Sequence, residues 1–274
     1  MRLVVATTDD DPLAGEFWGA YRRAGGPPPA AVMFLARRRR APAWRVVVEG
    51  LLLFGLRGGV RAWRLRRQAR SVLRHAPQRV FAGVGAFYRV ASLNRGEGLA
   101  ILGRIKPDLL VSAGSPEVFK PHVLSLPTIG SVNVHNGRLP AYRGLFGTFW
   151  EALRGEVWGY ACVHAMSPDV DAGPVLAQGP VRMDGCGLWE VLAAKKRLGG
   201  GLLAWVVRFA QDTGHLPPPC PLNDSLVPGY YGWPRLGDIL RLWLARRLAR
   251  LGQTPGRRAR AQPWPADLAG DVHA

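Results

Sequence analysis

The sequence predicts an α/β fold, in which helices cover both faces of a Rossmann-like, mainly parallel sheet and a short helical extension follows. Short apolar runs alternate with longer amphipathic ones through residues 2–215, as expected for repeated strand-helix-strand units. Of the 274 residues 48% are hydrophobic, enough for a large buried core. A Pro-rich run at 216–221 then precedes a basic tail. We therefore expect an α/β domain at 1–215 and a Pro-rich linker with a basic helical extension at 216–274.

The first third of the chain is expected to begin strand, helix, strand, at Arg2–Thr7, Pro12–Ala24 and Ala30–Leu35. The segment Trp44–Leu73 reads as helical, with an interruption at Gly58-Gly59. Its first half is apolar and is expected to be a core helix, and its arginine-studded second half is expected to be an amphipathic surface helix.

Strand and helix patterns continue through the rest of the chain. The expected strands are Arg79–Val84, Asp108–Ala113, Ile129–His135, Tyr160–Met166 and Val175–Arg182. The expected helices are Glu97–Ile105, Phe146–Glu156, Leu188–Asp212 and, in the tail, Leu236–Leu251. Parallel strands collect reactive groups at their carboxyl ends, so a functional site is expected at that edge of the sheet.

The formal net charge of +18 is large. Such a charge favours nucleic acid, an anionic membrane or a phosphorylated small molecule as partner. However, nearly all of the basic residues are arginines in a chain also rich in Ala, Gly and Pro, which is equally typical of a high-GC genome. Two readings therefore stay open for the run Arg37–Arg40 and for the basic segments 44–73 and 236–260: solvated surface, or contact with an anionic partner.

Cysteine usage and apolar run lengths indicate the compartment. The three cysteines, Cys162, Cys186 and Cys220, lack metal-ligand spacing, and an odd number of cysteines is a poor basis for a disulfide framework. The first apolar run is too short for a signal peptide. The longest apolar run, Val46–Leu56, is well short of the roughly 20 residues of a membrane span. We expect a soluble, cytoplasmic protein without a bound metal.

The stretch from Ile129 carries the pattern most suggestive of chemistry. Alternation along a strand places Val132 and Val134 on one face and Asn133 and His135 on the other. An amide and an imidazole aimed from one strand face gain nothing from burial in a core. An acidic turn containing Asp171 follows downstream, and together the three groups indicate acid–base chemistry on a carbonyl.

These residues also stand in a familiar order. Asn133-Val134-His135, Leu139-Pro140, Tyr142-Arg143-Gly144, Gly155-Glu156, His164-Ala165-Met166 and Asp171-Ala172-Gly173-Pro174 follow one another along residues 107–181. This order resembles the folate-dependent formyltransferase family, which includes the glycinamide ribonucleotide, methionyl-tRNA and sugar N-formyltransferases. The resemblance implies formyl transfer from N10-formyltetrahydrofolate to an amine through a tetrahedral intermediate. It implies an oxyanion donor at Asn133, a hydrogen-bond donor and proton relay at His135, and a proton acceptor at Asp171 that favours the charged imidazole.

The resemblance also implies a folate site and a structural role for His164. The pteridine would lie between the loop after the strand ending at Ala113 and the loop before Asp171, with a mouth shaped by the segment after His135. The implied folate-binding residues are Gly114, Ser115, Val118, Phe119, Leu139, Pro140, Asp169 and Val170. Arg143-Gly144 would hold the following turn. The triplet Asn136-Gly137-Arg138 departs from the family pattern, so we expect a rebuilt wall on the acceptor side.

The acceptor is the least constrained part of the prediction. The first loop carries Asp9, Asp10 and Asp11, which would repel a phosphate and could receive a cationic amine. The tail after 216 is expected to be too short for the barrel-like domain of methionyl-tRNA formyltransferases. We therefore favour a small amine, such as an amino sugar or a nucleotide- or lipid-linked amine, over RNA. The alternatives are a methionyl-tRNA-type enzyme and a non-catalytic membrane-peripheral protein on this scaffold. Aromatic side chains that could stack on such a substrate, or simply pack, are Trp18, Tyr21, Trp150, Tyr230, Tyr231 and Trp233.

Overall fold

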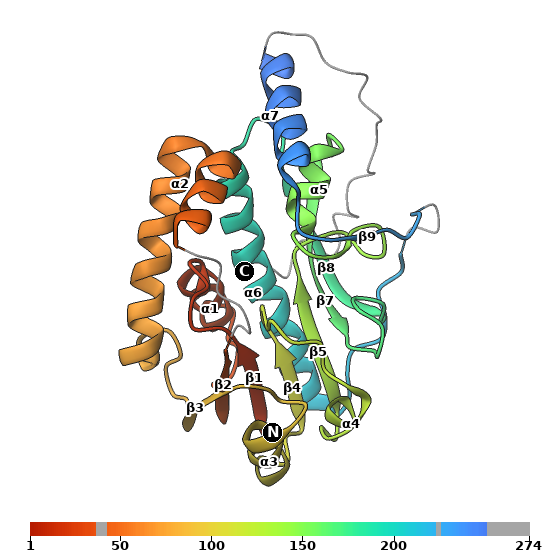
Figure 1. The fold of residues 1–274 in the computed structure, drawn as a ribbon. Helices are drawn as coiled ribbons and strands as arrows, with labels where there is room; N and C mark the ends of the chain where they lie inside the picture. Colours follow the sequence, from red (N-terminus) through yellow and green to blue (C-terminus); the bar gives the residue numbers. More distant parts are fainter. Residues whose placement is uncertain (37–42, 223–225, 251–274) are drawn as a thin grey trace.

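A computed structural model describes residues 1–36, 43–222 and 226–250. Its centre is a seven-stranded sheet in the order β3-β2-β1-β4-β5-β7-β8 (Figure 1). The strands are β1 (Leu3–Thr7), β2 (Ala31–Leu35), β3 (Ala86–Val90), β4 (Leu109–Ser112), β5 (Gly130–His135), β7 (Trp158–Ala165) and β8 (Val175–Arg182). The run Arg37–Arg40 and the end of the chain from residue 251 lie outside the described residues.

The sheet is parallel through its first five strands and antiparallel at one side. Strands β3, β2, β1, β4 and β5 pair in parallel, and β7 and β8 then add antiparallel strands beside β5. The chain moves outward from β1 to β2 and β3 in one direction, and from β4 to β5 in the other. The carboxyl ends of β1 and β4 are therefore a topological switch point, where ligands bind in open α/β sheets. This arrangement confirms the predicted fold class.

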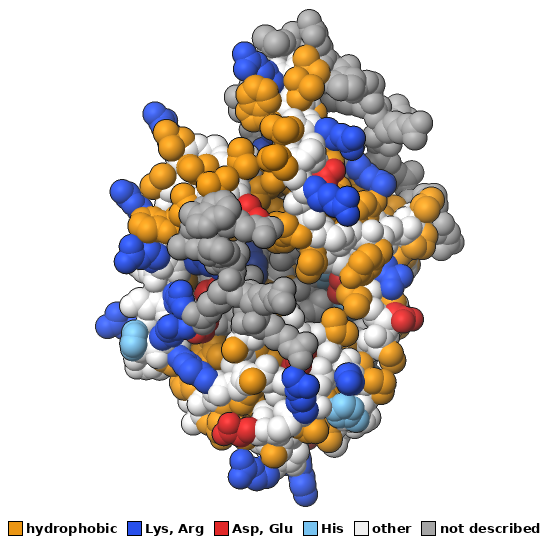
Figure 2. All heavy atoms as spheres, in the orientation of Figure 1, with side chains coloured by type: hydrophobic (Ala, Val, Ile, Leu, Met, Phe, Trp, Pro, Cys, Tyr) orange, Lys and Arg blue, Asp and Glu red, His pale blue; other side chains and the backbone are white. Residues whose placement is uncertain are grey.

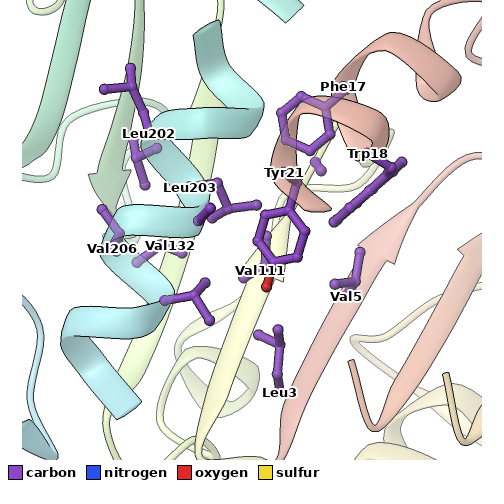
Figure 3. Packing of buried hydrophobic residues seen from close by; sticks show 14 of the residues in the cluster. Leu3, Val5, Phe17, Trp18, Tyr21, Val111, Val132, Leu202, Leu203 and Val206 are labelled. Carbon is purple, nitrogen blue, oxygen red and sulfur yellow. The ribbon is translucent and has the colours of Figure 1, made fainter. Parts of the chain in front are cut away.

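Helices cover both faces of the sheet. Strand β1 is buried along its whole length because its side chains alternate between two apolar layers. Leu3 and Val5 pack against α1 (Ala14–Arg23) and α6 (Leu188–Thr213), as Figure 3 shows. Val4 and Ala6 pack instead with α3 (Gly96–Ile105) and α4 (Pro121–Leu124). The remaining helices are α2 (Ala43–His75), α5 (Gly147–Leu153), α7 (Leu236–Arg250) and the 3-10 turn η1 (Pro77–Arg79).

One predicted strand is wrong. Arg79–Val84 was expected to be a strand, but the chain there forms η1 and a turn, and the strand is β3 at Ala86–Val90. The apolar residue Phe81 is 3% exposed and packs against Trp18 and Phe34 as an anchor of the turn. Gly83 has a φ of 76°, a conformation that a β-strand does not contain. The segment resembles a strand in sequence because Phe81, an apolar residue of the turn, is buried in the core.

The helical segment α2 breaks at a different glycine from the one expected. The interruption is at Gly55, with φ 70° and ψ 176°, while Gly58 and Gly59 are helical. The two halves of α2 fold back on each other, as the close approach of Gly59 to Leu51 shows. A Cβ added at Gly59 would lie only 2.8 Å from backbone atoms of Leu51. Gly59 is therefore needed for close packing rather than for the bend. The first half is also not a core helix, since Leu53 is buried but Val48 and Leu52 are exposed.

The tail beyond the Pro-rich run returns to the domain. Strand β9 (Tyr230–Tyr231) pairs in parallel with β6 (Arg143–Gly144), a two-stranded sheet that the sequence did not predict. The helix α7 follows, close to its expected bounds, and packs on α5 through Ile239 and Leu242. The division at 215/216 stays a prediction, and the β6–β9 pairing crosses it.

Candidate active site

The site begins with the pairing of two antiparallel strands. Asn133 on β5 lies directly opposite His164 on β7, so both side chains project from the same face of the sheet. The Asn133 Nδ2 atom lies 3.1 Å from His164 Nε2. The other ring nitrogen of His164, Nδ1, lies 2.9 Å from the Ala165 carbonyl oxygen, which can only accept, so Nδ1 carries a proton. In the neutral ring, Nε2 then accepts a hydrogen bond from the Asn133 amide.

Asp171 reaches the same pair from the turn before β8. Its Oδ1 accepts from Asn133 Nδ2 at 3.3 Å and lies 3.3 Å from His164 Nε2. Its Oδ2 accepts from the Gly144 N–H at 2.9 Å. The turn is held by Arg143, whose guanidinium donates to the Val170 carbonyl through Nε at 3.0 Å and Nη2 at 2.9 Å. The backbone of Asp171 has a φ of 50°, a left-handed conformation that Asp tolerates better than most residues.

His135 completes the cluster at the end of β5. Its Nε2 lies 2.7 Å from the Tyr142 carbonyl oxygen and therefore carries the proton in the neutral ring. Its Nδ1 lies 3.5 Å from Asp171 Oδ2. Asp171 therefore has an imidazole at each oxygen, and the structure brings all three predicted catalytic residues together.

The charges in this cluster are set by burial and by these contacts. Burial lowers the pKa of His135 below its ordinary 6.5, and this effect outweighs the favourable charge of Asp171. Asp171 does favour the charged imidazole, as expected, but it does not keep the ring charged. Burial alone would raise the pKa of Asp171, yet His164, His135 and the Gly144 N–H together lower it to about 2. At neutral pH the site therefore presents an ionised carboxylate beside a neutral imidazole.

The acidic loop after β1 differs from its expected role. Each of its carboxylates forms an ion pair: Asp9 with Arg74 at 2.8 Å, Asp10 with Arg66 at 2.6 Å, and Asp11 with Lys196 at 2.6 Å. Because α2 and α6 supply these cations, the loop binds its own helices. The expectation that its carboxylates repel a phosphate or receive a cationic amine assumed unpaired charges and is not supported by this geometry.

Known proteins are similar to this chain over the segment that contains the candidate site. The family model described as formyl transferase matches residues 56–186, a range that contains Asn133, His135, His164 and Asp171. This range of the chain is therefore similar to formyl transferases. A methionyl-tRNA formyltransferase of Syntrophus aciditrophicus is 31% identical over 165 residues, which are 58% of this chain and 52% of that protein. The chain spans about half the length of the curated relatives it matches.

Solved formyltransferase structures share the fold. A sugar N-formyltransferase from Shewanella sp. aligns with a TM-score of 0.53 at 15% identity and covers 88% of each chain. Glycinamide ribonucleotide transformylase 1 from Symbiobacterium toebii aligns with a TM-score of 0.52 at 18% identity, over 79% of this chain and 93% of that one. Both confirm the Rossmann-like α/β architecture.

The implied folate residues occupy two loops at the carboxyl edge of the sheet. Ser112 pairs with Asn133, so the loop beginning at Gly114 leaves the sheet beside β5. In that loop Gly114 is exposed, Ser115 is half-buried, and Val118 is 57% exposed and could cover an aromatic ring. Phe119 is 1% exposed in the core, so only its backbone is available to a ligand.

The second group of implied folate residues is also mixed. Leu139 is 2% exposed and packs with Cys162 and Val175, so it shapes the loop from beneath. Pro140 follows it through a cis peptide bond and is half-buried, as is Val170. Asp169 is exposed. Their side chains therefore border the turn of Asp171 without converging on one point, and their role in folate binding stays a prediction.

Sequence reasoning missed the contacts of His164, Tyr142 and Gly144 with the trio. His164 was assigned a structural role because its position in a strand carried no signal of its own. The antiparallel register of β5 with β7 places it opposite Asn133, and that register cannot be read from composition. Trp18 and Tyr21 were candidate stacking residues, but they are 3% and 1% exposed and belong to the core. Among the residues that the structure describes, no cluster of His, Cys, Asp and Glu could hold a metal ion.

The pKa shifts of His135 and Asp171 predict that acid destabilises the fold in two steps. The unfolded chain binds a proton at His135 below pH 6.5, which the folded state resists. It binds another at Asp171 below pH 3.8, while the folded carboxyl stays ionised to about 2. The free energy of unfolding therefore decreases as the pH falls below the unfolded-state pKa of His135, and again below that of Asp171. Urea unfolding of the wild type and of His135→Gln, from pH 7 to 5, should show a steeper decline in the wild type. Equal slopes would contradict the lowered pKa of His135.

Proposed function

We propose that this chain transfers a formyl group from N10-formyltetrahydrofolate to the primary amine of a small-molecule acceptor. One observation carries the proposal: the Asp171 carboxylate lies 3.3 Å from the Asn133 amide and 3.5 Å from the His135 imidazole, within the range that matches formyl transferases. The groups suit this donor, because attack of an amine on a formyl carbon needs an oxyanion donor and a proton acceptor. The folate would lie along the loops that contain Gly114 to Val118 and Asp169 to Val170.

The geometry suggests how each residue acts. Asn133 Nδ2 donates to His164 at 3.1 Å and to Asp171 at 3.3 Å. The longer bond is the one that the formyl oxygen replaces, so that the amide donates to the developing oxyanion. Asp171, ionised at neutral pH, attracts the amine nitrogen as it becomes positive and takes its proton directly or through a water. The buried His135 Nδ1 is the next acceptor for that proton. The amine nitrogen bonds to the formyl carbon, and the bond between that carbon and N10 of the folate breaks. N10 takes the proton held at His135, and the N-formylated acceptor and tetrahydrofolate result.

Several observations support a small acceptor, with an amino sugar or a nucleotide- or lipid-linked amine favoured. The β6–β9 sheet lies directly beside Asp171 and brings Tyr230 and Trp233, both exposed, to this side of the molecule. Tyr231 stacks on Tyr142 and Trp150, with centroids 5.7 and 5.0 Å apart, so it serves as packing. A small exposed aromatic surface suits a sugar or base ring better than an RNA helix.

Methionyl-tRNA is the second candidate acceptor. Curated relatives that match this chain are methionyl-tRNA formyltransferases, and the net charge of +18 would favour RNA. Arginine-rich helices also suit other anionic partners, so the charge alone does not select among them. The two candidates differ in a single measurable property, the identity of the amine that is formylated.

The test is an assay of the purified chain with N10-formyltetrahydrofolate and a panel of amines that includes nucleotide-linked amino sugars, lipid-linked amines and Met-tRNA. With a small amine we expect its N-formylated product, detected by mass spectrometry, and a loss of about 10²–10³ in kcat for Asn133→Ala. Faster formylation of Met-tRNA would select the second candidate. Folate binding without turnover on any amine would favour a non-catalytic, membrane-peripheral protein instead.

A positioning role for His164 gives a further prediction. His164→Leu removes the acceptor that orients the Asn133 amide, so kcat should fall by about tenfold to a hundredfold with little change in KM for the amine. His164→Gln can still accept through its amide oxygen and should recover much of the rate. Steady-state kinetics of both variants provide the check. Equal losses in kcat for the two variants would show that hydrogen bonding to Asn133 is not what His164 contributes.

A further inference from the structure

Two helices expose apolar side chains that the proposed chemistry does not use. On α2 and α7 these side chains define a surface, called here the α2–α7 face, composed of Val48, Leu52, Leu56, Val60, Leu236, Leu240, Trp243 and Leu244. Leu56, just after the bend at Gly55, is 73% exposed, and Trp243 is 55% exposed. On α7 the exposed apolar positions recur with helical spacing in a stripe beside the buried Ile239 and Leu242. The apolar surface of α7 is therefore wider than the part that packs against the domain.

Both helices lie at the same end of the molecule. Leu53 of α2 and Ile239 and Leu242 of α7 share one buried cluster with Phe149 and Leu188. Through this cluster α2 and α7 both pack against the α5 end of the domain, so their exposed sides belong to the same end of the molecule. Figure 1 shows the bend of α2 and the whole of α7 at the upper end of the molecule, away from the loop that precedes α4.

The surroundings of this face are strongly basic. Arg57, Arg61 and Arg64 on α2 and Arg241 and Arg247 on α7 are exposed. Each helix contains one carboxylate, Glu49 or Asp238. Figure 2 shows hydrophobic side chains interspersed with blue Lys and Arg side chains over this end. An apolar surface rimmed by arginines differs from an ordinary solvated face, whose exposed positions are mostly polar.

We propose that the α2–α7 face lies on an anionic lipid bilayer, with its leucines and Trp243 at the acyl boundary and its arginines on lipid phosphates. An amphipathic helix with arginines beside its apolar side lies in the plane of the interface. Near an anionic surface each arginine contributes on the order of 1 kcal/mol. None of the described helices is long and apolar enough to cross a membrane, which agrees with attachment in the plane. This inference concerns attachment alone and does not rest on the proposed formyl transfer.

The chemistry of the face favours lipid over two other occupants. RNA would pair with the arginines through its phosphates, but it would leave the aliphatic side chains of Leu52, Leu56, Leu240 and Leu244 without partners. A second copy of this chain would cover the leucines but would oppose two arginine-rich surfaces, which repel each other. An anionic bilayer supplies both an apolar interior and negative phosphates.

The test is flotation of the full chain with vesicles of phosphatidylcholine, with and without phosphatidylglycerol. We expect binding to the anionic vesicles that weakens as salt is raised, and much weaker binding to pure phosphatidylcholine. Leu56→Glu and Trp243→Glu should each lower the partition coefficient by about tenfold or more, because a buried apolar contact is replaced by a charge that the lipid repels. Both positions are exposed, so circular dichroism should show unchanged helix content.

The matched control is Trp205→Glu on α6. Trp205 is 42% exposed and lies about 25 Å along α6 from Leu188, at 1.5 Å per residue, so it is remote from the α2–α7 face. This variant should bind vesicles like the wild type. The proposal is overturned if the wild type does not float, or if Trp205→Glu loses as much binding as Trp243→Glu. It is also overturned if Leu56→Glu and Trp243→Glu abolish self-association or RNA binding while vesicle binding is unchanged.

Discussion

Replacing Asp171 by Asn is expected to lower kcat by about 10²–10⁴-fold, the range for loss of a positioned acid–base group. Asn keeps an oxygen that can accept from the Gly144 N–H, at 2.9 Å from Oδ2 in the wild type. It carries no negative charge to attract the amine nitrogen and takes no proton. The fold should survive because Arg143 continues to hold the turn through the Val170 carbonyl.

The assay for this variant measures formation of the N-formylated acceptor, with the acceptor found for the wild type. Asp212→Asn is the matched control, because Asp212 is exposed at the far end of α6 and should leave kcat unchanged. Thermal unfolding of both variants shows whether any loss comes from instability. A folded Asp171→Asn protein with more than a tenth of the wild-type kcat would remove Asp171 from the mechanism.

Replacing Lys195 by Ala is expected to cost about 3–5 kcal/mol of unfolding free energy, as for other buried ion pairs with one partner removed. Lys195 and Glu151 are both 0% exposed and form an ion pair between α6 and α5. Glu151 Oε1 also accepts from the backbone N–H groups of Arg138 at 2.9 Å and Tyr160 at 3.1 Å. Burial lowers the pKa of Lys195 and raises that of Glu151, so each charge depends on the other.

Two further variants distinguish the contribution of the ion pair to stability from that of side-chain volume. The double variant Glu151→Gln with Lys195→Met leaves no unpaired charge, and the glutamine oxygen can still accept both backbone N–H groups. It should therefore regain much of the free energy lost in Lys195→Ala. Lys196→Ala, which removes the partly exposed partner of Asp11, should cost about 1 kcal/mol or less. Urea unfolding measures all of them, and a similar loss for Lys195→Ala and Lys196→Ala would contradict the argument.

Local patterns in the sequence predicted the sheet and the placement of Asn133 and His135 on one face of β5. Short apolar runs located β1, β2, β4, β5, β7 and β8 closely, and β8 has the expected bounds. The alternation along β5 correctly placed Val132 and Val134 on the side of the α1–α6 core, away from Asn133 and His135. The resemblance joined Asp171 to them across the chain, which periodicity alone could not do.

The errors and omissions involve contacts between segments far apart in sequence. The sequence predicted a helix interruption at Gly58 and Gly59. The interruption is at Gly55, and its position depends on how the two halves of α2 pack together. The carboxylates of the first loop were treated as free because their partners Arg66, Arg74 and Lys196 lie 56 to 185 residues away. The buried pair Glu151 and Lys195 carried no signal, since charged residues in amphipathic helices normally face solvent.

The small sheet between β6 and β9 connects the tail to the candidate site. Arg143 N donates to the Gly229 carbonyl at 2.9 Å and Leu145 N to the Tyr231 carbonyl at 2.8 Å. Between these two bonds, Gly144 turns its own N–H to Asp171. A shift of β9 by one residue would displace both of these backbone hydrogen bonds. The Gly144 N–H between them would then move away from the Asp171 carboxylate. Because α7 begins five residues beyond Tyr231, a displacement of that helix would reach the hydrogen bond between Gly144 and Asp171 through a short segment of chain.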